Sequence, residues 1–233
     1  MNILAVDTVI RGCSVAILIN GKLVSTLLND QSKKQSEVLI SMISEACEGA
    51  NLNIFEFDLI AVTIGPGSFT GLRVGIATAR GLALAADIPC IGVTSTEAFA
   101  QSISCETYDR GPVLVALNST NENLFFQLFG SGRVPLTQVF EGTPKKLKDK
   151  LGQLKVTELV RVVGQASEMV CSELSRSSFN LRIVEGFDWP NAGHVAELAF
   201  KRHKSGNNQL DAKPLYIKAP YAVMPISGGK LRP

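Results

Sequence analysis

The sequence predicts an α/β protein with mixed sheets and two lobes. Each half of the chain has a strand meander followed by alternating helices and strands, an order typical of α/β domains. Asn20-Gly21 between two apolar runs is a strong signal for a type I′ hairpin, so the first strands are expected to be antiparallel. The continuous apolar run Leu59–Ile64 predicts a strand that is buried on both faces. The two halves show no clear sequence repeat.

The first lobe is expected within residues 1–105. Its predicted strands are Asn2–Asp7, Cys13–Ile19, Lys22–Leu28, Leu59–Ile64 and Pro89–Val93. Its predicted helices are Ser36–Gly49, Gly71–Ala86 and one that runs to about Cys105. Thr94 and Glu97 have the spacing of a capping box and open the last of these helices.

A smaller second lobe, with a C-terminal helix and tail, is expected within residues 106–233. Its predicted strands are Pro112–Leu117, Leu124–Phe129 and Leu159–Val163. Its predicted helices begin at Thr143-Pro144, at Gly164 and at Asn191, and the last is closed by Gly206.

Composition excludes several function classes. The chain has 233 residues, 45% of them hydrophobic, which is enough for a good core. A net charge of +2 falls short of the basic footprint of a dedicated nucleic-acid binder. No stretch approaches the roughly 20 apolar residues of a membrane span, and the N-terminus lacks a signal peptide, so we expect a cytoplasmic protein without membrane contact. Five cysteines without a C-x-x-C pair and two histidines nine residues apart predict neither a metal site nor a cofactor.

Asp7 and Thr8 form the first candidate site. An apolar strand that delivers these residues to a turn can make a phosphate loop, in which the carboxylate organises a metal-bound water. The alternative is that both residues cap a hairpin, and the sequence alone favours this structural role. We therefore interpret Asp7 and Thr8 as a vestigial phosphate loop.

The second candidate is a glycine-rich turn that precedes a helix, with Gly65, Gly67, Ser68 and Gly71. Such a turn can bind an anion through free amides, but it matches neither the Walker pattern nor G-x-G-x-x-G. A structural turn capped by Ser68 is the interpretation that we favour. Catalysis by Ser68 lacks support, because the G-x-S-x-G elbow is absent and both histidines lie far along the chain.

The Ser36–Gly49 and Gly71–Ala86 helices form a candidate partner surface. The apolar arc of the first covers roughly 200°, against the roughly 100° that a core-facing helix needs. The second is apolar almost all round, with small residues that permit close approach of another helix. Both could be simple core helices, but the excess apolar width favours a partner surface. The predicted interface residues are Val38, Leu39, Met42, Ile43, Ala46, Arg73, Ala77 and Arg80.

Three segments resemble the TsaB (YeaZ) family. They are the opening NILAVDT, the stretch AVTIGPGSFTGLRVGIATARGLALAADIP and the tail motif KPLYIKAP, with Pro214, Tyr216 and Lys218. The resemblance implies an actin-like (ASKHA, ribonuclease-H-like) two-lobed fold. It also implies a complex with a TsaD-like catalytic paralogue and a TsaE-like ATPase, which transfers threonylcarbamoyl to the tRNA adenosine beside the anticodon. The contact with tRNA would be indirect, through that complex.

Departures from the patterns of active enzymes predict a non-catalytic subunit. TsaD-type enzymes bind metal through paired histidines on a helix, and no such pair exists here. Gln35 stands where many relatives have a histidine, Asn118 replaces a carboxylate, and Gly164 is alone where an adenosine-binding turn usually has two glycines. The alternatives are an actin-like-fold ATPase or small-molecule kinase and, with least support, a peptidase. In isolation the chain is expected to self-associate through its partner helices.

Overall fold

The computed structural model describes residues 1–10, 12–30, 35–103, 111–119, 123–185, 189–206 and 210–217, with the side chains of Gln35 and Ser36 excepted. Two residues of the sequence analysis, Cys105 and Lys218, lie outside these ranges.

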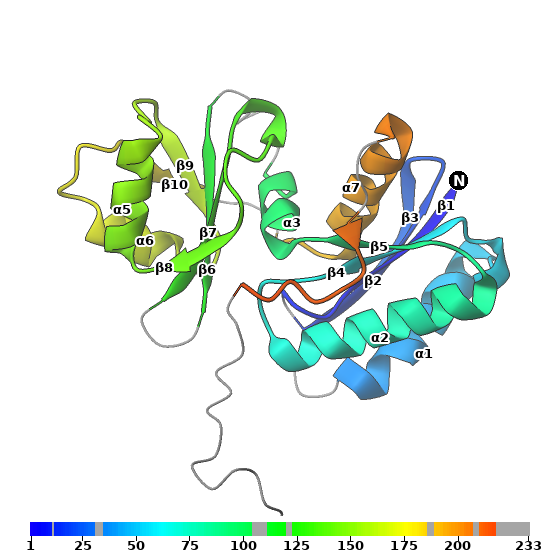
Figure 1. Cartoon of the computed structure of the whole chain (residues 1–233). Coiled ribbons are helices and arrows are strands. Elements are labelled where there is room, and N and C mark those ends of the chain that lie inside the picture. Colours follow the sequence, from blue (N-terminus) through cyan, green and yellow to red (C-terminus); the bar gives the residue numbers. More distant parts are fainter. Residues whose placement is uncertain are drawn as a thin grey trace, which may run out of the picture.

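The chain folds into alternating layers of helices and sheets (Figure 1). The first sheet has the strand order β11-β5-β4-β1-β2-β3. Its strands are β1 (Asn2–Asp7), β2 (Cys13–Ile19), β3 (Lys22–Asn29), β4 (Leu59–Thr63), β5 (Cys90–Val93) and β11 (Leu210–Asp211). The pairs β1–β2 and β2–β3 are antiparallel, whereas β1–β4 and β4–β5 are parallel, so the expectation of a mixed sheet is confirmed.

The second sheet has the order β10-β9-β6-β7-β8. Its strands are β6 (Val113–Asn118), β7 (Leu124–Phe129), β8 (Phe140–Gly142), β9 (Val160–Val163) and β10 (Leu181–Ile183). The helices α5 (Pro144–Gln153) and α6 (Ser167–Glu173) cover its outer face. β8 and β10 have only three residues each and were not predicted from the sequence.

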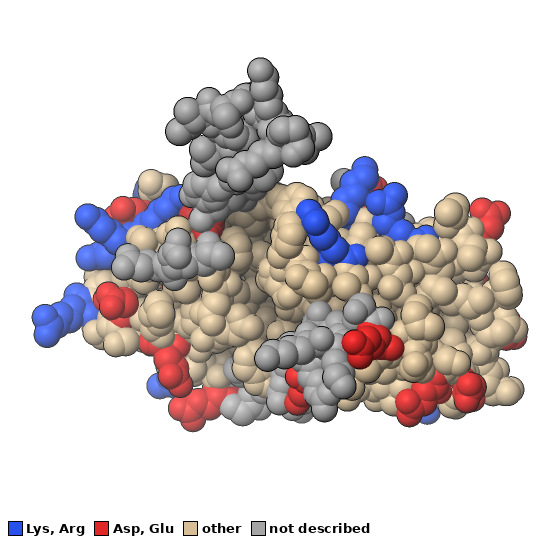
Figure 2. Space-filling view, turned by 90° about the horizontal axis from the view of Figure 1, so that it is seen from below, with Lys and Arg blue, Asp and Glu red and all other residues tan. Residues whose placement is uncertain are grey.

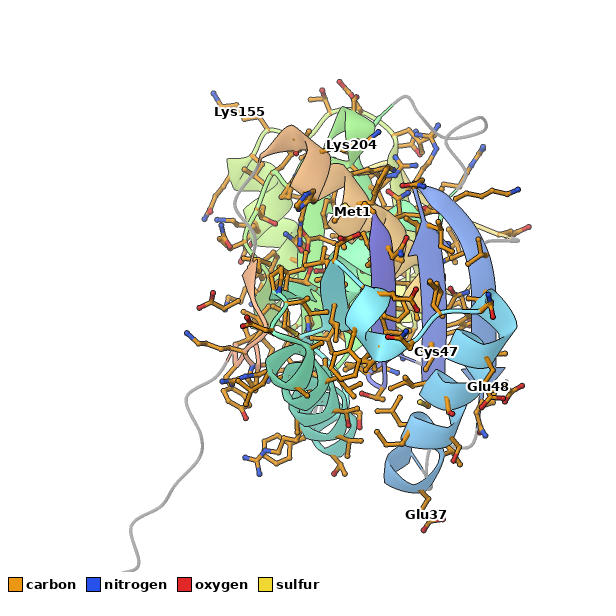
Figure 3. All side chains as sticks on the ribbon, turned by 90° about the vertical axis from the view of Figure 1, so that its right-hand side faces the viewer. Met1, Glu37, Cys47, Glu48, Lys155 and Lys204 are labelled. Atoms are coloured by element: carbon orange, nitrogen blue, oxygen red, sulfur yellow. The ribbon has the colours of Figure 1, made fainter. Side chains whose placement is uncertain are left out.

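The outer face of the first sheet carries α1 (Gln35–Ala50) and α2 (Phe69–Ala86). A 3-10 helix, η2 (Ile54–Glu56), leads into β4, and a second one, η3 (Ser131–Arg133), follows β7. In Figure 3, Glu37 and Glu48 of α1 point away from the sheet, while Cys47 packs toward the core. The two helices contact each other as well as the sheet beneath them.

Two further helices, α3 (Ser95–Gln101) and α7 (Ala192–Ser205), lie between the sheets. α7 packs on β1 and β2 of the first sheet, while α3 packs on β6 and β7 of the second. One apolar cluster joins residues from both sheets, among them Ile3, Phe99, Val113, Phe129 and Val195. The two lobes therefore share a core, and Arg202 of α7 reinforces it by pairing with Glu97 of α3.

The expected lobe boundary is wrong for the C-terminal elements. α7 packs on the first sheet and β11 pairs with β5, so both belong to the first lobe although they come last in the chain. The second lobe is formed by the described residues between Val113 and Ile183. An amphipathic helix shows in its sequence that it has an apolar face, but not which sheet that face will cover.

Local signals predicted several turns and caps correctly. Asn20 and Gly21 both have positive φ, as a type I′ turn requires. Thr94 and Glu97 form the expected capping box, Thr143 caps α5 with Pro144 in its first turn, and Gly206 closes α7 in the left-handed conformation. Across the described ranges, none of the helices is both long enough and apolar enough to cross a bilayer.

We predict that Ser14→Ala loosens the attachment of α7. The Ser14 hydroxyl accepts a buried hydrogen bond from the Ala192 amide at 2.8 Å. Its loss leaves a buried N–H without a partner, which should lower the free energy of unfolding by about 1–3 kcal/mol. Urea denaturation measures the change. The exposed Ser41→Ala on α1 is the control and should stay within about 0.5 kcal/mol of wild type; equal stabilities of the two variants would contradict the prediction.

Candidate functional site: an outer helix face and a cleft between the lobes

The glycine-rich turn shapes the start of α2. Ser68 is its N-cap and accepts a hydrogen bond from the Gly71 amide at 3.2 Å. Gly67 has a φ of 153°, and a Cβ there would lie 2.5 Å from a methyl carbon of Val9. The turn is thus packed tightly on the loop after β1. The helix cap made by Ser68 and the close packing of Gly67 explain why these residues occur here.

Thr8 ties that loop to α2. Its hydroxyl donates a buried hydrogen bond to the Gly71 carbonyl at 2.6 Å. A Cβ on Gly75, one turn further along, would come within 2.3 Å of the same hydroxyl oxygen, so only glycine fits. Gly75 therefore serves the contact with Thr8 and faces inward, so it is not one of the small residues that could let another helix approach α2.

Asp7 lies deep beside Thr8, with 1% of its surface exposed. Its Oδ1 accepts a hydrogen bond from the Val9 amide at 3.1 Å. Burial raises the pKa of this carboxyl to about 6, and the Thr63 hydroxyl and the amides of Val9 and Ile10 offset only part of the effect. The carboxylate serves the turn and does not line the cleft described next.

A cleft of about 600 Å³ lies between the lobes, beside the start of α2. The first lobe contributes Val9, Ile10 and the residues from Pro66 to Phe69. The second lobe contributes Asn118, Ser119, Phe125, Glu141 and Gln165, and the C-terminal segment adds Leu215, Tyr216 and Ile217. Among these described lining residues, Glu141 is the one with a charged side chain, and its Oε1 accepts a hydrogen bond from Ser119 at 2.6 Å. Such a lining suits a phosphate group poorly, because none of its described residues is a cation that could offset the phosphate charge.

The lone Gly164 also has a structural explanation. Its φ is 113°, and a Cβ would approach the Ala116 carbonyl oxygen to 2.3 Å. Next to it, Gln165 Oε1 accepts a hydrogen bond from the Asn118 amide at 3.3 Å. The segment thus closes onto the end of β6 at the place where an adenosine-binding turn was considered.

The structure divides the predicted interface residues into two groups. Leu39, Met42, Ile43 and Ala46 are buried in the core between α1, α2 and the sheet, so their assignment to an outer surface is wrong. Val38 is half-buried, while Arg73, Ala77 and Arg80 are exposed along α2. The wide apolar arc of α1 arises because this helix contacts β2 and β3 on one side and α2 on another.

The exposed face of α2 carries small and apolar residues beside Arg73 and Arg80. Ala77, Gly81 and Leu84 follow one another at helical spacing, and Leu84 is 85% exposed. A Cβ on Gly81 would meet nothing within 4 Å, although a glycine inside a helix costs about 0.5–1 kcal/mol relative to alanine. At the start of the helix, the Arg73 guanidinium lies 4.0 Å over the exposed Phe69 ring, on which Tyr216 also packs.

Part of this exposed face was not predicted from the sequence. Leu84 and Phe69 are exposed, as is Ile40 of α1, and together with Ala77 and Gly81 they form what we call the outer helix face. Their exposure could not be read from the sequence, because α2 is apolar on almost every side and its inward direction is fixed by Thr8.

Comparisons with known proteins give the family. A family model described as TsaD, tRNA N6-adenosine threonylcarbamoyltransferase, matches residues 26–133. A Haemophilus influenzae protein named tRNA threonylcarbamoyladenosine biosynthesis protein TsaB is 34% identical, over 94% of this chain and 94% of that protein. The chain belongs to the TsaB family. Among solved structures, YeaZ from Pseudomonas aeruginosa has a TM-score of 0.74 at 21% identity, covering 92% of this chain and 99% of that one.

The TsaB-family chain has the actin-like fold that was expected. A more distant structure, the ROK hexokinase from Thermus thermophilus, has a TM-score of 0.52 at 10% identity, over 88% of this chain and 100% of that one. Among the residues that the structure describes, no group of three His, Cys, Asp or Glu side chains is placed to hold a metal ion.

We predict that Asp7→Asn stabilises the protein at neutral pH. Because the folded-state pKa of Asp7 lies above its ordinary value of 3.8, the folded protein resists losing this proton, and ionisation above about pH 6 costs stability. A rise of about two pKa units corresponds to about 2–3 kcal/mol. The variant should exceed wild type by about that amount at pH 7.5, and the difference should shrink as the pH falls from 6 toward 4.

Chemical denaturation at both ends of this pH range makes the measurement. The exposed Asp149→Asn is the control and should show no comparable gain at either pH. A gain for Asp7→Asn that does not depend on pH would show that the ionisation of Asp7 is not its cause.

Proposed function

We propose that this chain is a non-catalytic subunit of the machinery that forms N6-threonylcarbamoyladenosine in tRNA, and that its outer helix face binds a TsaD-like catalytic paralogue. Membership of the TsaB family supports a role in this tRNA modification. The exposed face of α2 carries the proposal of a docking role, because Gly81 and Leu84 have no structural explanation inside the chain. A TsaE-like ATPase and tRNA would join through the resulting complex in the cytoplasm.

The cleft supports the non-catalytic part of this proposal. Asp7 and Thr8 are buried in packing contacts, and the described cleft lining offers no cation for a nucleotide phosphate. The alternatives of an ATPase, a small-molecule kinase or a peptidase therefore gain no observation in their favour. This lining leads us to expect that the isolated chain binds Mg-ATP weakly or not at all.

The same face can pair two copies of this chain when the paralogue is absent. A flat helix surface centred on Ala77 and Gly81 lets a partner backbone approach closely, and a related subunit would present a similar helix. Self-association would then compete with the heterodimer, because both use one surface.

We predict that Ala77→Glu and Leu84→Glu weaken binding of the TsaD-like paralogue without unfolding the chain. Both side chains point to solvent, so the free subunit tolerates a charge, whereas a docked partner would strip water from a carboxylate that Arg73 and Arg80, three or four residues away, offset only in part. Each change should therefore weaken binding at least about tenfold, since covering an incompletely paired charge costs more than about 1.4 kcal/mol. Titration calorimetry with the purified paralogue measures the affinity, and circular dichroism checks the fold.

Met169→Glu is the matched control, because Met169 is an exposed residue on α6 of the second lobe. It should bind the paralogue as wild type does. If the folded α2 variants bind with unchanged affinity, the docking surface lies elsewhere.

We predict that Gly81→Ala has opposite effects on stability and on binding. Alanine should stabilise α2 by about 0.5–1 kcal/mol, since the added methyl meets no neighbour. The same methyl group should weaken the complex by holding the partner helix away. Gly152→Ala near the end of α5, where a methyl would also meet nothing, should stabilise the chain and leave binding unchanged. Thermal melts and calorimetry separate the two effects; tighter binding by Gly81→Ala would rule out close helix approach.

A further inference from the structure

The second lobe carries a concentrated positive charge on α5. The stretch from Pro144 to Lys155 contains five lysines and one aspartate. Leu147 and Leu151 hold the helix to the lobe and are buried, whereas Lys145, Lys148 and Lys155 are exposed. The basic residues thus occupy the outward side of a helix whose apolar side already packs on the second lobe.

This charge opposes the helix that carries it. Lys145 and Lys146 lie in the first turn of α5, where the helix dipole favours acidic residues, and no acid is present there. By contrast, α1, α3 and α6 each have a glutamate in the first turn. Lys145 and Lys148 are three residues apart and Lys146 and Lys150 four apart, so these like charges repel one another along the helix. Asp149, four residues from Lys145 and three from Lys146, offsets only part of this repulsion.

The lysines are not neutralised by neighbours. Among the residues that the structure describes, none of the five forms an ion pair, and Lys146 donates a hydrogen bond to the Glu141 carbonyl at 2.9 Å. Lys146 and Lys150 border a hollow of about 630 Å³ whose lining also includes the Asp149 carboxylate and the hydrogen-bonding groups of Thr137, Gln138 and Gln153. One aspartate cannot balance five lysines, so this excess of positive charge without an internal partner points to an external one.

The location of α5 leaves the outer helix face free. α5 lies at the far end of the molecule from α1 and α2 (Figure 1). Figure 2 shows lysine and arginine side chains, with some acidic ones among them, projecting from the second-lobe end, and Lys155 points outward in Figure 3. One partner can therefore bind the outer helix face while another contacts α5.

We propose that α5 adds a direct contact with the phosphate backbone of tRNA to the indirect association through the complex, with Lys145, Lys148, Lys150 and Lys155 as phosphate contacts. The choice of tRNA rests on the proposed function, since that is the polyanion of the modification reaction. A membrane surface fits less well, because Leu147 and Leu151 are buried in the lobe and cannot enter a bilayer. Lysines at a helix surface give affinity and orientation and do not read base sequence.

The test measures binding of the purified full chain to a labelled, unmodified tRNA transcript by fluorescence anisotropy at several salt concentrations between about 50 and 200 mM. The variant combines Lys145→Gln, Lys148→Gln and Lys150→Gln. The matched control combines Lys22→Gln, Lys201→Gln and Lys204→Gln, three exposed lysines of the first lobe, so that the net charge changes equally. Calorimetric binding of the TsaD-like paralogue is measured for each protein alongside.

The α5 variant should bind tRNA at least about tenfold more weakly than wild type at 100 mM salt. The slope of the logarithm of the binding constant against the logarithm of salt should fall by about 2–3, since each lost phosphate contact lowers it by about 0.7–0.9. The control should keep most of the wild-type affinity, and all three proteins should bind the paralogue equally.

Equal tRNA affinities and slopes for the α5 variant and the control would overturn the proposal, as would a wild-type chain without measurable affinity for tRNA. If the α5 variant no longer binds the paralogue but still binds tRNA, the proposal is wrong and α5 is a protein-docking surface instead. A wild-type chain that binds tRNA through α5 but binds no paralogue would contradict the proposed function and leave this inference standing.

Discussion

The position of α2 depends on how Thr8 packs against it. The hydroxyl donates to the Gly71 carbonyl, and Gly75 lies against the same oxygen, so the loop after β1 fixes both the depth and the rotation of the helix. That rotation places Ile76 and Ala79 in the core and leaves Ala77, Gly81 and Leu84 outside. One buried hydrogen bond thus determines which side chains of α2 face the core and which face solvent.

The sequence predicted the mixed α/β class, the first hairpin and most helix caps, because each rests on a few neighbouring residues such as Asn20-Gly21 or Thr94 with Glu97. It did not predict which residues form the outer helix face. The arc of α1 is wide because the helix lies in the angle between a sheet and α2, and such a position cannot be distinguished in a sequence from a position beneath a partner. β11 has two residues, too few for any periodicity, so its pairing with β5 could not be foreseen.

The two ends of the molecule differ in chemistry. The outer helix face offers Ala77, Gly81 and Leu84. Such residues would stabilise a complex by fitting the shape of a partner and by removing apolar area from water. α5 offers lysines, whose attraction acts at longer range and is weakened by salt. The shared core around α3 and α7 holds these ends in a fixed relation, since residues of both sheets join one apolar cluster. The rigid body between the two ends would then set the distance and angle between whatever binds at each.

The return of α7 and β11 to the first sheet has a consequence for synthesis on the ribosome. The second lobe is continuous between Val113 and Ile183 and has its own apolar cluster with α5 and α6, so its outer side can pack as soon as it emerges. The first sheet cannot, because Ile3, Ala5, Ala16 and Leu18 face the place that α7 will occupy. One apolar face of the N-terminal strands therefore stays uncovered until α7 has been synthesised, after the second lobe. During this interval the nascent chain would benefit most from a chaperone.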